Sequence, residues 1–321
     1  MPALKPAWRN LLGLLLAAAF FSPLRAVERS VKQTFPVEAG ATLKFSTYRG
    51  GVTVESTNEA QIRVEVHLEA GTEDQTLADR LFKNLDLQLT AQGKNVTVQA
   101  RNPSESRAQF TWSKTGLDLG FRIFVPRTCH LDLTTTDGNI AVGEAGGNVV
   151  AHSRGGTISC RQVGGDVRAT SDTGEIVVSR CAGAVDLRVT RGAIRAGTIF
   201  GAATLRNGRG DIEIQNARGT LTATTAGGDV AAGFSRQHRG EATIKADGGN
   251  IFVSLDPAIA CEVQASSGLG GQVQSKLPFA LLPSGNSKRA LAGKLNGGGP
   301  LLVLRASGGN VKLEPSTQFI E

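Results

Sequence analysis

Glycine recurs every nine residues along the middle of this chain, and that period constrains the fold more than any other feature. An apolar side chain follows each glycine by two residues and another follows by four, so each unit alternates as a β-strand does. A short fixed period is typical of a stacked β-solenoid, in which each glycine permits the bend before the next strand. The period runs through eleven glycines: Gly138, Gly147, Gly156, Gly165, Gly174, Gly183, Gly192, Gly201, Gly210, Gly219 and Gly228.

Comparison of alternate units separates two apolar columns, which favours a coil of eighteen residues with two strands. The fold class predicted is all-β: a single-chain, parallel, right-handed β-helix or solenoid with nine-residue strand units. Each strand is expected to pair in register with the strand eighteen residues on, about 4.8 Å away. One column is Ile140, Ile158, Ile176, Ile194, Ile212 and Val230, and the other is Val149, Val167, Val185, Ala203 and Leu221.

The first residues predict export. Two basic residues precede an apolar run from Leu11 to Phe21, and Ala26 supplies a small residue for cleavage, so residues 1–26 are expected to be a secretory signal peptide. The run is too short to cross a membrane, and nothing after Ala26 resembles a transmembrane segment. We therefore expect a protein of the periplasm, the cell surface or the extracellular space.

Three further segments are expected after the signal peptide. Residues 27–128 predict an irregular β region and cap, with one short helix near the N-terminus over 72–84. Residues 129–254 hold the regular solenoid repeats, and residues 255–321 predict C-terminal coils and a second cap. The caps matter because uncovered strand edges at the ends of a solenoid pair with other chains.

Two features of the later repeats refine this prediction. A three-residue insertion around residues 234–238 interrupts the period, which then resumes at Gly240 and Gly249. The alternating segments at 301–304 and 309–313 are expected to be the strands that close the solenoid.

Charge gives little evidence for a particular partner. The net charge is +7, and removal of three basic residues and no acidic ones with the signal peptide leaves +4. Such a small positive charge does not indicate that the protein binds nucleic acid.

The four cysteines are expected to be small buried hydrophobes, although an oxidising compartment leaves a disulfide open. Their spacing fits no metal site, and Gly164-Gly165-Asp166 lacks the third glycine of calcium-binding β-rolls. No cofactor or metal is therefore expected. The cysteines are Cys129, Cys160, Cys181 and Cys261.

Outward carboxylates are one candidate site. Asp211 and Asp229 lie eighteen residues apart, each directly after a glycine, and Glu213 is expected on the same face. Carboxylates about 5 Å apart suit polysaccharide cleavage or a cation. The alternative is that aspartate simply favours the residue after a turn glycine, and that Arg195 neutralises Glu213.

Outward arginines are the other candidate. Arg188 with Arg206, and Arg191 with Arg209, are expected to form two short columns and so a basic ridge for acidic glycans or lipopolysaccharide phosphates. The alternative is an ordinary solvated face, on which charges balance as Arg168 and Asp186 would.

Four short motifs follow one another over roughly 290 residues of the mature chain. They are Gly50-Gly51-Val52-Thr53-Val54, Phe121–Pro126, Thr136-Asp137-Gly138-Asn139-Ile140, and Gly298-Gly299-Pro300-Leu301 with Gly309-Asn310-Val311. Through these motifs the mature chain resembles the bacterial putative adhesin domain family of unknown function, a group of exported β-strand-repeat proteins. The resemblance implies a right-handed β-helix exported to the cell envelope and supplies no catalytic residues.

These observations favour an exported, non-catalytic structural or interaction module, an adhesin of the cell envelope. Its partners would be envelope or host polysaccharides, or proteins. The alternative is a carbohydrate-active β-helix enzyme that uses the outward carboxylates, and a purely architectural role stays open. Repeats fix a scaffold and leave its chemistry undetermined.

Overall fold

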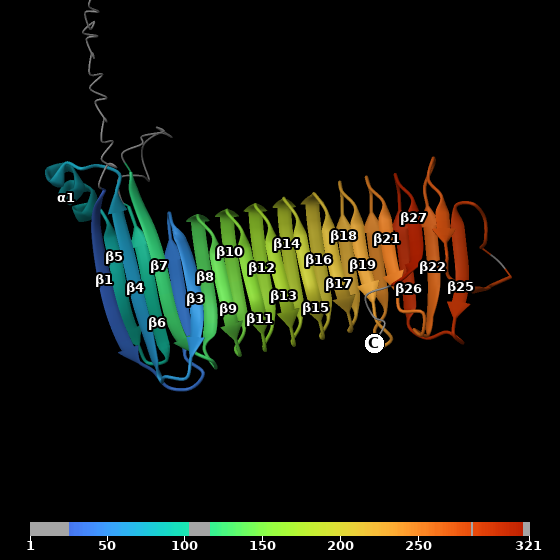
Figure 1. Ribbon diagram of the computed structural model, residues 1–321, viewed down its shortest axis with the longest axis horizontal. Helices are drawn as coiled ribbons and strands as arrows, with labels where there is room; N and C mark the ends of the chain where they lie inside the picture. Colours follow the sequence, from blue (N-terminus) through green and yellow to red (C-terminus); the bar gives the residue numbers. More distant parts are fainter. Residues whose placement is uncertain (1–25, 103–115, 284, 317–321) are drawn as a thin grey trace, which may run out of the picture.

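The computed structural model describes residues 26–102, 116–283 and 285–316, and the expected signal peptide lies outside them except for Ala26. The described chain forms two long sheets, called sheet A and sheet B, that run the length of the molecule (Figure 1). Along the repeats, successive strands alternate between the two sheets, so the chain winds as a solenoid. The all-β class and the long parallel sheets agree with the repeat pattern of the sequence.

Each strand is hydrogen-bonded to its neighbours in the spatial order of its sheet. Sheet A contains β1 (Val27–Pro36), β4 (Gln61–Ala70), β7 (Leu117–Pro126), β3 (Gly51–Thr57), β9 (Ile140–Ala145), β11 (Ile158–Val163), β13 (Ile176–Cys181), β15 (Ile194–Ile199), β17 (Ile212–Ala217), β19 (Val230–Phe234), β21 (Ile251–Leu255), β27 (Val311–Pro315) and β23 (Val273–Ser275). Sheet B contains β24 (Ala280–Leu281), β25 (Ala290–Leu295), β22 (Cys261–Ser267), β26 (Leu301–Ala306), β20 (Ala242–Ala246), β18 (Leu221–Thr225), β16 (Ala203–Arg209), β14 (Val185–Arg191), β12 (Val167–Thr173), β10 (Val149–Gly155), β8 (His130–Asp137), β2 (Thr42–Thr47), β6 (Asn95–Arg101) and β5 (Asp86–Gln92).

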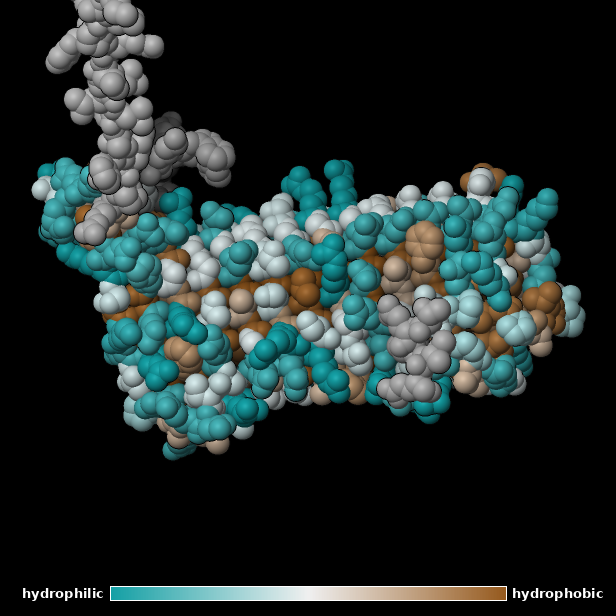
Figure 2. Space-filling model, viewed as in Figure 1, coloured by the Kyte–Doolittle hydropathy of each residue, from teal (hydrophilic) through white to brown (hydrophobic). Residues whose placement is uncertain are grey.

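Parallel pairing holds identical or similar side chains in stacks. Ile176 pairs with Ile158 on one side and with Ile194 on the other, and all three are fully buried. In the second sheet Val167 pairs with Val149 in the same way. The core is therefore a thin layer of aliphatic side chains from both sheets, and Figure 2 shows its hydrophobic atoms as a band between hydrophilic groups.

One insertion changes the register within the repeats. Leu221 of β18 pairs with Ala242 of β20, and Val230 of β19 pairs with Ile251 of β21, so partners here lie twenty-one residues apart. This confirms the three-residue insertion predicted between β19 and β20. The extra residues form the loop around His238, whose side chain is buried against Phe234 with 4.8 Å between ring centroids.

The four cysteines lie in the core as free thiols. Cys160 and Cys181 occupy inward positions of β11 and β13. Burial raises the pKa of the Cys160 thiol to about 12, because the thiolate would lie in apolar surroundings. The prediction of small buried hydrophobes is confirmed, and the disulfide alternative is wrong.

The N-terminal cap lies outside the first coil. Strands β2 and β3 stack directly on β8 and β9, while β4, β5, β6 and β7 lie beyond them together with α1 (Gln75–Lys83). Asp74 caps the helix by accepting hydrogen bonds from the backbone N–H groups of Thr76 and Leu77. Ala78 and Phe82 face the core, as their helical spacing predicts.

The C-terminal cap differs from the sequence prediction. The expected closing strands, β26 and β27, lie one coil inside the end, between β20 and β22 and between β21 and β23. The outermost coil is β22 with the three-residue β23, followed by the antiparallel pair β24 and β25. The inner position suits β26 and β27 because Leu302, Leu304 and Val311 are fully buried there.

Candidate functional site

The predicted pair Asp211 and Asp229 stacks on adjacent coils at the turn that leads into sheet A. Asp211 Oδ1 accepts a hydrogen bond of 2.8 Å from the backbone N–H of Asp229. Asp229 Oδ1 in turn accepts bonds from the backbone N–H of Asn250 at 2.7 Å and from its Nδ2 at 3.2 Å. Each carboxylate therefore links its own coil to the next.

The same linkage recurs at other turns where asparagine replaces aspartate. Asn139 Oδ1 accepts from Thr157 N, and Asn148 Oδ1 accepts from Asp166 N. Because neutral asparagine serves as well as aspartate, these ladders need an acceptor oxygen and not a negative charge.

Glu213, the third acidic candidate, lies on the outer face of β17 beside an arginine. Arg195 forms ion pairs with Glu213 at 3.7 Å and with Glu175 in the preceding turn. The three groups are partly or largely exposed, and one guanidinium between two carboxylates leaves a single negative charge in excess.

The basic candidates on sheet B converge on one carboxylate. Arg188 donates two hydrogen bonds to Asp186, from Nε at 3.2 Å and from Nη2 at 3.0 Å. Arg168 and Arg206, in the strands on either side, approach the same carboxylate at 3.8 Å each. Three guanidinium groups thus share one negative charge, so this group, the sheet-B arginine cluster, carries an excess of two positive charges.

A shallow groove of about 530 Å³ runs beside the sheet-B arginine cluster. Small residues line part of it, among them Ala184 and Ala202, and Val150 lies exposed at one end. Thr204 adds a hydroxyl next to Asp186 in the ladder. The groove combines apolar surface, a hydroxyl and guanidinium groups on one face.

Arg191 and Arg209, the second predicted column, pair in register at the end of β14 and β16. Both side chains are exposed, and neither forms an ion pair with a described carboxylate. The structure places them three residues beyond Arg188 and Arg206, where the chain turns toward sheet A.

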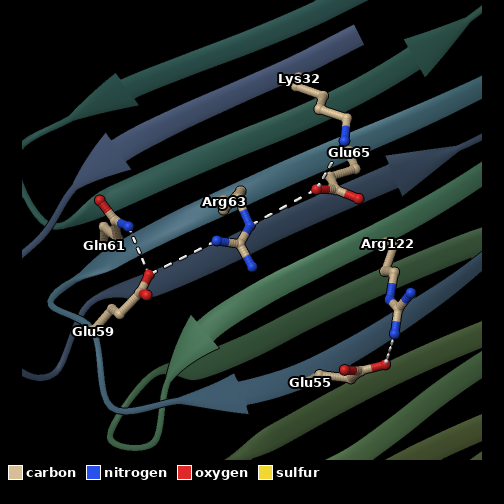
Figure 3. A network of polar contacts seen from close by, with 7 residues as sticks. All are labelled: Lys32, Glu55, Glu59, Gln61, Arg63, Glu65 and Arg122. Carbon is tan, nitrogen blue, oxygen red and sulfur yellow. Dashed lines mark hydrogen bonds and ion pairs between the residues drawn. The ribbon is translucent and has the colours of Figure 1, made fainter. Parts of the chain in front are cut away.

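The N-terminal part of sheet A carries a different pattern of charge. Arg63 lies between Glu59 and Glu65, Lys32 approaches Glu65 at 3.4 Å, and Arg122 donates to Glu55 at 2.9 Å (Figure 3). Acidic and basic groups alternate and are matched, so this face holds little excess charge.

Sequence reasoning missed a group at the opposite turn, where the chain passes from sheet A to sheet B. The guanidinium carbons of Arg180 and Arg218 lie 4.8 and 4.6 Å from the centre of the Phe200 ring. The available signal was Phe200 itself, an aromatic residue in a turn position held by Gly146, Gly164 and Ala182 in earlier coils.

Neither a metal cluster nor a membrane-spanning helix occurs in the described residues. Residues 26–102, 116–283 and 285–316 contain no group of three histidine, cysteine or acidic side chains suited to a metal ion. Nor do they contain a helix with the length and hydropathy needed to cross a membrane.

The model of the family described as Toastrack DUF4097 matches residues 42–314. The chain belongs to the Toastrack family. The match covers the solenoid and most of both caps, and it agrees with the resemblance seen in the sequence motifs. No curated protein matches this Toastrack chain.

Several solved structures are similar to this Toastrack chain at low identity. A putative adhesin from Bacteroides fragilis is 11% identical, with 90% of this chain and 97% of that one covered and a TM-score of 0.39. A putative cell adhesion protein from Clostridium sporogenes is 10% identical, with coverage of 90% and 100% and a TM-score of 0.24. A putative lipid binding protein from Parabacteroides distasonis is 11% identical, with coverage of 90% and 97% and a TM-score of 0.33.

Proposed function

We propose that this protein is an exported, non-catalytic binding module of the cell envelope that holds an anionic polysaccharide along the outer face of sheet B. The observation that carries the proposal is the sheet-B arginine cluster, in which Asp186 is shared by Arg168, Arg188 and Arg206 beside the 530 Å³ groove. Guanidinium groups recognise carboxylate, sulfate and phosphate through paired N–H donors.

The solenoid gives this face a regular geometry. Strands stack about 4.8 Å apart, so equivalent side chains on successive coils form rows along the molecule. An extended polymer lying along these rows would meet several groups at once, and several weak contacts sum to a useful affinity. We propose an eighteen-residue, right-handed coil as the unit of this array, and the pairing of Val149 with Val167 supports its length.

Asp186 fixes the arginines as well as reducing their charge. Its side chain is 25% exposed, whereas Arg168, Arg188 and Arg206 are each more than half exposed. The carboxylate therefore lies beneath the guanidinium groups and orients them, while their remaining N–H donors face solvent. Preorganised donors lose less conformational freedom when a ligand binds.

The non-catalytic part of the proposal rests on how the candidate carboxylates are engaged. Asp211 and Asp229 accept backbone N–H groups of the next coil, and Glu213 pairs with Arg195. A glycosidase needs one carboxyl to act as an acid and another to act as a base or nucleophile. Carboxylates used as ladder acceptors are poorly suited to either role.

The test is retention of the mature protein on immobilised alginate, an anionic polysaccharide, with neutral dextran as the comparison. We expect retention on alginate that weakens as salt rises. The double variant Arg188→Ala/Arg206→Ala should lose most of this retention.

A matched control removes the same charge elsewhere. Arg122→Ala/Arg195→Ala deletes two arginines of similar exposure from sheet A. If this control reduces retention as much as Arg188→Ala/Arg206→Ala does, binding follows net charge and the proposed face is wrong. New reducing ends in the alginate would instead establish the enzymatic alternative.

A further inference from the structure

The turn from sheet A to sheet B carries a second group of arginines. Phe200 N donates to Cys181 O at 3.0 Å and Arg218 N donates to Ile199 O at 2.9 Å, so Phe200 lies in the coil between those of Arg180 and Arg218. The two arginines that reach the Phe200 ring therefore come from the coils on either side of it.

These two guanidinium groups have no acidic partner in the part of the chain that the structure describes. Among the described residues, neither Arg180 nor Arg218 forms an ion pair or donates a side-chain hydrogen bond, and Arg218 Nε is buried without an acceptor. On sheet B, by contrast, Arg188 is bound to Asp186 through two donors. Stacking on an aromatic ring uses the face of a guanidinium and leaves the N–H donors in its plane available.

The register-breaking insertion lies against this group. Arg239 N donates to Arg218 O at 2.9 Å, and His238 Nδ1 lies 3.0 Å from Ala217 O. Arg239 Nη1 bonds to the carbonyls of Arg236 and His238, which fixes the loop. The insertion between β19 and β20 thus places Arg239 one coil beyond Arg218, with Arg236 in the same loop.

Buried polar groups also gather here. Asn216 and Ser235 are each less than 8% exposed, and Asn216 Oδ1 and Ser235 Oγ have no hydrogen-bond partner among the described residues. Buried polar atoms normally have partners, and an exception in a native fold calls for an explanation such as strain, a functional role or a bound water or ion. Nearby carboxylates do not balance the arginines: Asp256 Oδ2 accepts the backbone N–H of Arg236, and Glu241 is exposed and forms no ion pair with a described residue.

We propose that Arg180, Phe200 and Arg218, beside the loop that carries Arg236 and Arg239, form a binding site for a phosphate monoester. Two guanidinium groups without acidic partners match a dianion better than the single charge of a carboxylate or sulfate ester. A phosphate monoester carries about −1.5 to −2 at neutral pH and offers three acceptor oxygens. The Phe200 ring offers both guanidinium groups an aromatic surface, and stacking on a ring leaves the N–H donors in the guanidinium plane available.

The test is isothermal titration of the mature protein with glucose 6-phosphate, and with glucose 6-sulfate and glucuronate as singly charged comparisons. We expect saturable binding of the phosphate and affinity at least tenfold weaker for the other two. Arg180→Gln and Arg218→Gln should each weaken phosphate binding by about tenfold or more, as loss of a charged hydrogen-bond donor does. Phe200→Leu should weaken it severalfold, because the guanidinium groups lose their stacking surface.

Two controls separate a built site from general attraction. Arg161→Gln removes the same charge from an exposed arginine on a neighbouring coil, where it pairs with Glu144 at 3.3 Å. Arg188→Ala/Arg206→Ala removes the face proposed for polysaccharide. Both variants should bind glucose 6-phosphate as the wild type does. The two proposals can therefore fail separately: loss of the polysaccharide site on sheet B would leave the phosphate site standing, and loss of the phosphate site would leave the polysaccharide site standing.

A second experiment distinguishes the two possible sources of the phosphate group, a lipid and a phosphorylated glycan. Sedimentation with phosphatidylcholine vesicles containing phosphatidic acid, compared with phosphatidylcholine alone, tests a lipid phosphate. Arg180-dependent sedimentation would assign the site to lipid, and binding of glucose 6-phosphate alone would assign it to a phosphorylated glycan. Absence of Arg180-dependent binding in both arms, or an equal loss in Arg161→Gln, would overturn the proposal.

Discussion

Asp211 Oδ1 accepts a 2.8 Å hydrogen bond from the backbone N–H of Asp229, one coil further along the solenoid. Asp211 is a catalytic candidate in the sequence, but through this bond its side chain links two coils of the solenoid. It also explains why both asparagine and aspartate occur at this place in the repeat, since both offer the same side-chain oxygen. The consequence is a prediction about which substitutions the position tolerates.

Asp211→Asn should leave stability nearly unchanged, whereas Asp211→Ala should lower the free energy of unfolding by about 0.5–1.5 kcal/mol through loss of one hydrogen bond. Urea denaturation of both variants measures the difference. Equal destabilisation by the two would mean that the charge of Asp211 matters and not its acceptor oxygen.

The turn glycines define a second prediction. Gly192 has φ of +139°, and a Cβ built there would overlap the carbonyl oxygen of Gly174 in the preceding coil. Gly192→Ala should therefore destabilise the protein by about 2 kcal/mol or more, combining backbone strain with a steric clash. Gly227, where a Cβ meets no atom within 4 Å, provides the control.

Gly227→Ala should change the urea midpoint little, and the contrast with Gly192→Ala isolates the coil-to-coil contact from the general effect of replacing glycine. A Gly192→Ala variant as stable as Gly227→Ala would show that the coils can separate locally to admit a methyl group.

Regularity decided what could be predicted from the sequence. The columns of Ile158, Ile176 and Ile194 follow from period alone, because alternation fixes which face a side chain occupies. The insertion was equally visible, since it shifts the glycines. The cluster of Arg180, Phe200 and Arg218 could not be seen in the sequence. Its members do not occupy one column of the repeat unit, and they come together only because of the directions in which their side chains extend.

The ends of the solenoid show a second limit of periodicity. A repeat pattern identifies β26 and β27 as strands but does not state the order in which coils stack. In the structure β27 lies inside β23 and β26 lies inside β22, and the outer strand β23 has only three residues. The Asp211–Asp229 pair and the Arg188–Arg206 column were visible in the sequence, whereas the hydrogen bonds that decide their roles were not.

The buried thiols make a third prediction. Burial raises the pKa of Cys160 to about 12, and that of Cys129 and Cys261 to about 11. At pH 8 the folded protein should therefore resist alkylation by iodoacetamide, while all four cysteines should react in urea, since the thiolate is the nucleophile. Mass spectrometry of the alkylated chain counts the modified residues.

The same shifts set a direction for stability against pH. A raised thiol pKa means that the folded state favours the protonated thiol. The contribution of these thiols to the free energy of unfolding is therefore complete below the usual thiol pKa of 9.0, and it is lost as pH rises through the pKa values of the folded state. Rapid alkylation of the folded protein at pH 8 would contradict the buried position of the thiols.

His238 makes the last prediction, because it ties the insertion to pH. The side chain is 2% exposed, packs against Phe234 and lies 3.0 Å from Ala217 O through Nδ1. Desolvation lowers its pKa below the ordinary value, so the folded state prefers the neutral ring. The unfolded chain then binds the proton more readily, and stability should fall as pH drops below about 6.5.

His238→Gln keeps a donor for the Ala217 carbonyl but does not titrate, so it should lose less stability than the wild type between pH 7 and pH 5.5. Urea unfolding of both proteins at each pH gives the comparison, and the other three histidines cancel because both proteins contain them. Equal losses would assign the acid sensitivity to other groups. A steeper loss in the wild type would show that the loop beside Arg218 is held in place by a neutral histidine.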